Sequence, residues 1–187
     1  MVEHALAALD EGNSLEATNI AKRDYPWVPA EVSKRKMPRK RALSVFMKDG
    51  FIDRYSGSRL IFPGTLLLLG KVLPDAFPAH ENWKVSETHD VYRELWPVVD
   101  HVDPVARGGS DDESNMVTTS ELNNGAKSSW TLEQLGWELY PPGDIDEWDG
   151  LMTWFLTYAR VNPEILENLT IDGWYRAANS TAGNGKS

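Results

Sequence analysis

This sequence of 187 residues predicts an α+β fold, with a short β-hairpin and a following helix placed between helical segments. The strands are indicated by two β-branched stretches, 97–103 and 115–119, on either side of a loop that contains Gly108 and Gly109. The helices are indicated by apolar residues at helical spacing, most clearly over 146–160. The length suits one well-buried domain with extensions, or at most two small domains.

The remaining elements follow from local sequence signals. A hairpin is predicted within 46–64, where apolar and polar residues alternate around Ser56 and Gly57. Thr131 and Gln134, three residues apart, form the pattern of a capping box at the start of a helix. From Ala177 onward the composition is typical of a disordered tail. Helices are predicted over these ranges: 1–24 (one or two short helices), 65–73, 86–95, 120–129, 146–160 and 162–169.

Composition narrows the class of protein. The 28 acidic and 19 basic residues give a formal net charge of −9, which disfavours a protein that coats nucleic acid non-specifically. The absence of cysteine excludes disulfides, thiol catalysis and thiolate zinc sites. Glu3 stands where a signal peptide would be positive, and the apolar run 65–73 has about half the length of a membrane span. We therefore expect a cytoplasmic protein that does not associate with membranes.

Positive charge is concentrated in the segment 34–41, where six of eight residues are basic and none is acidic. Such a run is usually a solvated segment. Here it is also the candidate contact for a polyanion such as nucleic acid. Its basic residues are Lys34, Arg35, Lys36, Arg39, Lys40 and Arg41.

Four polar residues are spaced over the predicted strand, loop, strand and helix. Asp100 at the end of the first strand could approach Asn124 in the first turns of the helix, and both offer hard oxygen ligands suited to Mg²⁺ or Mn²⁺. The imidazole of His101 can accept a proton from water near neutral pH. Asn115 can use its amide donor and its carbonyl to tie the loop backbone and hold the histidine in place.

Two cations and one tryptophan flank these residues. Arg107 and Lys127 could bind phosphate oxygens, although a solvated loop residue is an equally good interpretation of Arg107. Trp130 could stack on a base, but tryptophans are more often part of a core. A hard cation, a histidine base and flanking positive charge are together typical of phosphodiester hydrolysis.

The stretch 100–127, "DHVDPVARGGSDDESNMVTTSELNNGAK", resembles the HNH endonuclease motif, a ββα-metal fold. The resemblance implies that His101 is the general base and that Asp100 and Asn124 hold one Mg²⁺ or Mn²⁺, while Asn115 positions the histidine. It implies hydrolysis of DNA to 5′-phosphate and 3′-hydroxyl ends, with RNA left open as a substrate. The expected organisation is a helical and basic N-terminal arm over 1–44, an HNH core over 45–130, a C-terminal helical cap over 131–178 and a disordered tail over 179–187.

The chain differs from many HNH proteins, which bind a structural zinc through two C-x-x-C pairs. Alignment puts Asp53 and Ser56 at the first pair, and Ser120 and Asn123 at the second. We therefore expect no structural zinc, whose binding contributes roughly 10 kcal/mol or more in such sites. Hydrogen bonds among these four residues and a core rich in the eight tryptophans are predicted to replace it.

Two other interpretations stay open. A non-catalytic nucleic-acid-binding module could use the same scaffold, although it would need none of Asp100, His101 and Asn124. Alternatively, the C-terminal helices could bind a protein partner, with the motif serving no catalytic purpose. The sequence specifies neither the oligomeric state nor a recognition sequence.

Overall fold

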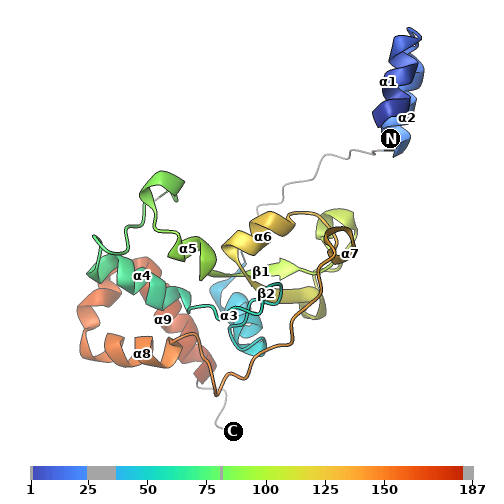
Figure 1. The fold of residues 1–187 in the computed structure, drawn as a ribbon. Helices are drawn as coiled ribbons and strands as arrows, with labels where there is room; N and C mark the ends of the chain where they lie inside the picture. The colour runs from blue at the N-terminus through green and yellow to red at the C-terminus, as the bar shows by residue number, and fades with distance from the viewer. Residues whose placement is uncertain (1, 25–36, 81, 183–187) are drawn as a thin grey trace. The chain divides into compact units, whose positions relative to one another are not determined.

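The computed structural model (Figure 1) describes residues 2–24, 37–80 and 82–182, and the chain divides into two compact units, Met1–Lys34 and Arg35–Ser187. The first unit contains two short helices, as predicted, α1 (Val2–Asp10) and α2 (Ser14–Asp24). They bury only Ala8 and Ala17. Lys34, Arg35 and Lys36 lie outside the described residues. Among the described helices, none has the length and apolar character needed to cross a membrane.

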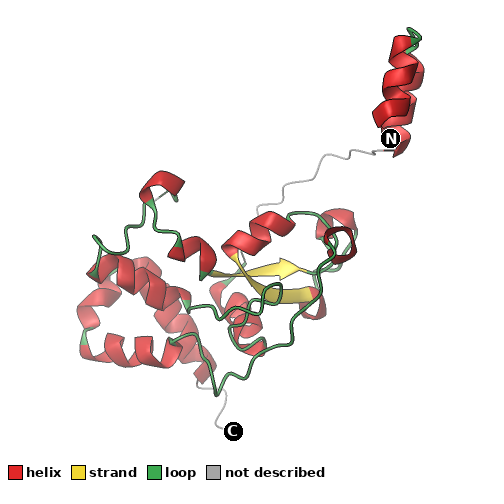
Figure 2. Cartoon of the chain, viewed as in Figure 1, coloured by secondary structure: helices red, strands yellow, loops and turns green. Residues whose placement is uncertain are grey.

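The second unit combines helices with a small antiparallel sheet, so the α+β class is confirmed. Strand β1 (Pro97–His101) pairs with β2 (Met116–Ser120), in a register that runs from Pro97 opposite Ser120 to His101 opposite Met116. Helix α6 (Glu121–Lys127) follows β2 directly. Figure 2 shows this sheet among helices and loops, and in Figure 1 it lies between α6 and α3 (Arg39–Lys48). All five residues of β2 are buried, because elements cover both of its faces.

The main core lies where α3, α4 (Pro63–Val72), α8 (Met152–Val161) and α9 (Leu169–Ala182) meet. The predicted tryptophan-rich core is wrong, because phenylalanine fills this space. Among the described tryptophans only Trp174 is buried. The fully buried phenylalanines are Phe46, Phe51, Phe62 and Phe155.

The other elements are short. Thr131 and Gln134 form the predicted capping box: the Thr131 hydroxyl accepts from the Gln134 amide at 3.3 Å, and the Gln134 side chain accepts from the Thr131 amide at 3.1 Å. The helix that it begins has only one turn. The short α-helices are α5 (Val91–Glu94) and α7 (Leu132–Leu135), and the 3₁₀ helices are Val85–Glu87, Val105–Arg107, Glu113–Asn115 and Pro163–Glu167.

Three predicted elements differ in extent from those in the structure. The hairpin predicted over 46–64 is restricted to a turn with a bridge between Ile52 and Arg59, because α3 extends through Lys48 and buries Phe46. The predicted helix 86–95 is broken at Thr88, whose backbone is extended. The helix predicted over 146–160 begins later, at α8, because Leu151 before it has a left-handed backbone.

Both ends of the predicted organisation also change. Residues 39–44 belong to α3 of the second unit instead of an N-terminal arm, and Ala42 and Leu43 are part of the core. Residues 179–182, predicted as disordered tail, continue α9 through Ala182. The two residues before them, Ala177 and Ala178, are buried against the core, which explains why helix forms in a small and polar sequence.

Candidate active site at the β-hairpin

Asp100 lies near the end of β1 and is held by two donors from other elements. Its Oδ2 accepts a hydrogen bond from the Tyr55 hydroxyl at 2.7 Å and forms an ion pair with Lys127 Nζ at 2.9 Å. Lys127 also donates to the main-chain oxygen of His101 at 2.8 Å. These contacts connect β1 to α6 and fix the orientation of the Asp100 carboxylate.

The prediction that Lys127 binds phosphate is therefore corrected. The side chain of Lys127 is completely buried, and its ammonium lies between Asp100 and the His101 carbonyl. A buried ammonium is stable only when it is paired and hydrogen-bonded, which both contacts provide. Lys127 thus orients Asp100 from within the protein and does not face an incoming substrate.

The sequence gives no signal for Tyr55. It lies in the turn between Ile52 and Arg59, 45 positions before Asp100, and its ring packs against Trp137 at 5.6 Å. Burial, and then the neighbouring Asp100 carboxylate, raise the pKa of the Tyr55 hydroxyl above its ordinary value. The hydroxyl therefore keeps its proton and donates a hydrogen bond to Asp100.

His101 follows Asp100 and contacts an acid that the sequence analysis did not select. Its Nε2 lies 3.0 Å from Oδ1 of Asp111 in the loop between the strands. The hydrogen bond from His101 is the main cause that lowers the pKa of Asp111, with Arg41 contributing. An ionised carboxylate can only accept a hydrogen bond, so we assign the ring hydrogen to Nε2. In the neutral ring Nδ1 then carries the lone pair.

Asn115 ties the loop together, as predicted. Its Oδ1 accepts from the Asp103 amide at 2.9 Å, while its Nδ2 donates to the carbonyls of Asp103 at 2.9 Å and Ser110 at 2.8 Å. The same loop needs Gly109, because a Cβ there would collide with the main-chain oxygen of Asp103. Asp103 takes part through its backbone, and its side chain is exposed.

Asn124 lies on α6, one turn before Lys127. Residues three apart share a helix face, so Asn124 lies on the side of α6 that contacts β1. Among the described residues, no hydrogen bond engages its side-chain amide. The structure thus brings the helix face of Asn124 to the strand that carries Asp100 and His101.

Those predicted nucleic-acid contacts that lie among the described residues are dispersed over the second unit. Arg107 is exposed, and its guanidinium lies over the ring of Trp130 at 5.5 Å. Arg39 packs over Trp174 at 5.8 Å, and Lys40 is exposed on α3. Arg41 Nη2 donates to the main-chain oxygen of Asp111 at 2.7 Å, while Nη1 lies 3.5 Å from its carboxylate.

The donor chemistry at this position fits a hard divalent cation. Oδ1 of Asp100 and the amide oxygen of Asn124 would be the protein ligands, since Oδ2 of Asp100 is already held by Tyr55 and Lys127. In the described part of the chain, no group of three or more His, Cys, Asp or Glu side chains forms a metal site. Such a cation would therefore depend on water and substrate oxygens for the rest of its shell.

Asp53, which the sequence resemblance aligns with a zinc-binding position, is a buried carboxylate. Oδ1 of Asp53 accepts from the Tyr55 amide at 2.9 Å and the Thr119 hydroxyl at 3.0 Å. Oδ2 accepts from the Ser120 amide at 3.0 Å and Nδ2 of Asn123 at 2.8 Å. Burial alone would raise the pKa of Asp53, but these hydrogen bonds outweigh it and lower the pKa.

The predicted hydrogen bonding among Asp53, Ser56, Ser120 and Asn123 is thus confirmed for the side chains of three of these four residues. Ser120 also caps α6, because its hydroxyl accepts from the Asn123 amide at 3.1 Å. Ser56 contributes only through its backbone, whose amide donates to the Asp53 carbonyl at 3.3 Å. Side-chain hydrogen bonds of Asp53 therefore join the turn before the sheet to the start of α6.

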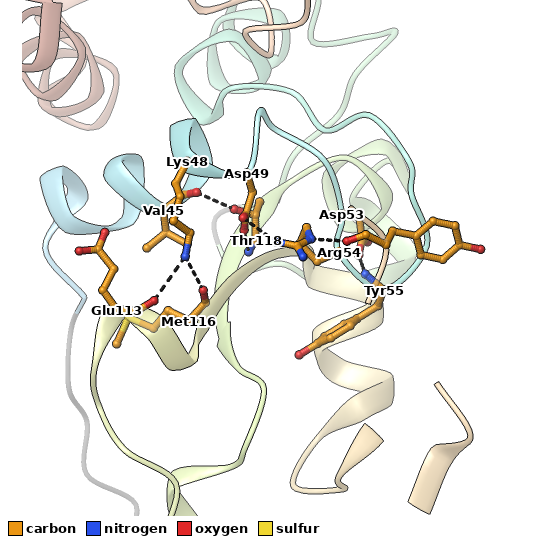
Figure 3. Close-up of polar contacts among 10 residues, drawn as sticks. Val45, Lys48, Asp49, Asp53, Arg54, Tyr55, Glu113, Met116 and Thr118 are labelled. Carbon is orange, nitrogen blue, oxygen red and sulfur yellow. Dashed lines mark hydrogen bonds and ion pairs between the residues drawn. The ribbon is translucent and has the colours of Figure 1, made fainter. Parts of the chain in front are cut away.

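Lys48 of α3 and Asp49 after it contact β2 and the segments near it, as Figure 3 shows. Asp49 is buried; its Oδ2 accepts from the Thr118 amide at 2.6 Å and its Oδ1 pairs with Arg54 at 2.8 Å. Lys48 donates to the carbonyls of Met116 at 2.8 Å and Glu113 at 3.3 Å. These bonds fix β2, and with it the paired strand that carries Asp100 and His101.

No protein-family model, curated protein or solved structure matches the chain. Function is therefore inferred from the chemistry and placement of the site residues themselves. They are Asp100 and His101 on β1, Asn115 at the base of the loop, and Asn124 on α6.

Proposed function

We propose that this protein is a metal-dependent HNH-type endonuclease that hydrolyses DNA phosphodiester bonds. The observation that carries the proposal is the β1–loop–β2–α6 unit, in which Asp100 and His101 end one strand and Lys127 joins both to the helix of Asn124. The hydrogen bonds of Asn115 across the loop add support, because a general base must be held rigidly.

In this mechanism His101 is the general base. Its Nδ1 takes a proton from a water molecule, whose oxygen bonds to phosphorus while the bond from phosphorus to the 3′-oxygen breaks. Held by Asp100 and Asn124, Mg²⁺ or Mn²⁺ would supply Lewis-acid stabilisation of the negative charge. The products carry a 5′-phosphate and, after the leaving oxygen takes a proton from solvent, a 3′-hydroxyl.

The remaining residues orient the site residues or attract the DNA backbone. Tyr55 and Lys127 fix the Asp100 carboxylate, and Asn115 fixes the loop that follows His101. Arg107 and Lys40 are exposed cations that are available to phosphate oxygens. The basic residues Lys34, Arg35, Lys36, Arg39 and Arg41 complete the proposed contact with the DNA backbone.

The chemical groups at the ends of the cleaved DNA provide the test. Supercoiled plasmid is incubated with the protein and Mg²⁺ or Mn²⁺, and the nicked product is treated with DNA ligase. We expect nicks that ligase reseals, because it requires adjacent 5′-phosphate and 3′-hydroxyl groups. Asp100→Ala should abolish nicking, whereas the exposed carboxylate variant Asp112→Ala should retain it. Equal nicking by Asp100→Ala, or ends that ligase cannot join, would contradict the proposed mechanism.

A second candidate function is a non-catalytic nucleic-acid-binding module. It is favoured by one observation: within the protein, Lys127 pairs with the charge of Asp100 and Tyr55 donates a hydrogen bond to it. Calorimetric titration of metal-free protein with Mn²⁺ distinguishes the two. A nuclease should show a site that Asp100→Ala removes, whereas DNA binding that is unaffected by EDTA, without such a site, would support the module.

A further inference from the structure

The loop between β1 and β2 presents one acid directly to the proposed general base. Asp111 Oδ1 lies 3.0 Å from His101 Nε2, within hydrogen-bond distance. The side chain of His101 is mostly buried, with 22% of its surface exposed, so the contact restricts an already confined ring. Of the carboxylates near His101 in sequence, Asp100 instead contacts Tyr55 and Lys127.

Asp111 is itself held from a different element. Arg41 on α3 donates to the main-chain oxygen of Asp111 at 2.7 Å, and its other terminal nitrogen lies 3.5 Å from Oδ2 of the carboxylate. On the other side, Asn115 donates to the carbonyl of Ser110, the residue before Asp111. The carboxylate is therefore placed by both the core helix α3 and the tied loop, although its side chain is 40% exposed.

The chemistry of this pair decides which ring nitrogen can act as a base. A carboxylate accepts but cannot donate, so the nitrogen that faces it must carry hydrogen. That assignment leaves the lone pair of the neutral imidazole on Nδ1. An acid placed in this way fixes both the tautomer and the rotation of a catalytic histidine, as in other catalytic sites in which a third group orients the base.

We propose that Asp111 is a positioning residue of this site: its carboxylate fixes the ring of His101 so that Nδ1 takes the proton from water. The proposal rests on the endonuclease function for its catalytic meaning, but the pairing itself can be measured without substrate. Asp111 touches no reacting atom, so its effect on the reaction passes through His101.

The first test is a spectroscopic measurement on metal-free protein. Long-range ¹H–¹⁵N correlation spectra near pH 8, where an ordinary imidazole is neutral, report which nitrogen of each histidine carries hydrogen. His101→Ala assigns the His101 signals among those of the four histidines. We expect hydrogen on Nε2 in the wild type and a mixture of tautomers in Asp111→Ala. Hydrogen on Nδ1 in the wild type, or unchanged signals in Asp111→Ala, would overturn the proposal.

The second test separates positioning from DNA binding. Loss of a partner that orients a metal-bound histidine typically lowers activity by about 10- to 100-fold, and we take the same scale for His101. We therefore expect Asp111→Ala to lower the cleavage rate at saturating DNA by about that factor while KM changes little. Asp111→Asn, which keeps an acceptor oxygen, should recover part of the rate. A wild-type rate in Asp111→Ala would refute the proposal.

Asp112→Ala is the matched control, because it removes the same charge from the neighbouring exposed position of the loop. It should cleave like the wild type, and an equal loss in both variants would attribute the effect to loop charge and refute the positioning role. The outcomes also separate this proposal from the endonuclease function. The expected spectra with no cleavage by any variant would retain the Asp111–His101 pairing and reject the nuclease.

Discussion

Asp53 offers the sharpest prediction about stability. It is 1% exposed, and its carboxylate accepts four hydrogen bonds, two on each oxygen, from Tyr55, Thr119, Ser120 and Asn123. Asp53→Asn preserves the shape of the side chain but replaces one oxygen with an NH₂ group that faces donors. Each buried donor left without an acceptor costs about 1–3 kcal/mol. We therefore expect the free energy of unfolding to fall by about 3 kcal/mol.

Urea denaturation followed by tryptophan fluorescence measures this loss, since Trp137 packs against Tyr55 next to the site. A thermal scan should show a decrease in Tm of roughly 6–12 °C for a domain of this size. Asp112→Asn, at an exposed position, is the control and should change stability by less than about 0.5 kcal/mol. If Asp53→Asn is as stable as this control, the carboxylate does not perform the stabilising role assigned to it.

Three further predictions concern the same region. The quadruple substitution Asp53→Cys, Ser56→Cys, Ser120→Cys and Asn123→Cys should create a zinc site. It would be detected as one Zn²⁺ per chain after dialysis and as a tetrahedral Co²⁺ absorption spectrum. A variant that binds neither metal would contradict the alignment with the zinc pairs. The pKa of Asp53 is lowered in the folded protein, so its ionised carboxylate stabilises the fold above the unfolded pKa, about 4, and this stabilisation is lost as pH falls through the folded pKa. Urea midpoints between pH 6 and pH 3 should therefore fall less steeply in Asp53→Asn than in the wild type. Parallel curves would refute this. Lys127→Met should lower the free energy of unfolding by about 3–5 kcal/mol, because it leaves the charge of Asp100 unpaired. Adding Asp100→Asn to this variant should restore part of the loss. Strictly additive effects in urea denaturation would show that the two side chains do not interact.

Local signals in the sequence were sufficient for the elements that carry the site. The β-branched stretches predict β1 and β2, and the short polar segment after them predicts α6, because period and capping are properties of neighbouring residues. The same holds for Asn115, since its hydrogen bonds stay within the loop that it closes. The hydrogen bonding of Asp53 with Ser120 and Asn123 was also predicted, from the small polar residues that the resemblance aligns with cysteine positions.

Contacts between distant segments were not predictable. Tyr55 reaches Asp100 across 45 positions, and Arg41 reaches Asp111 across 70, so neither pair leaves a periodic signal. Lys127 was predicted to contact phosphate because it lies three residues after Asn124, on the same face of the helix. In the structure its ammonium is buried against Asp100 instead, a pairing between α6 and β1 that no local signal shows. The stretch 46–64 was predicted as a hairpin from its alternation, but packing of Phe46 in the core extends helix α3 through Lys48.

The central claim is that His101 activates water in a metal-dependent cleavage of DNA. Its most direct test compares wild type, His101→Ala and His4→Ala on supercoiled plasmid with Mg²⁺, with Mn²⁺ and with EDTA, where His4 is an exposed histidine of the separate first unit. We predict nicking by wild type and His4→Ala that requires the metal, and none by His101→Ala. Metal-independent nicking, equal nicking by His101→Ala, or an intact plasmid with all three proteins would contradict the claim.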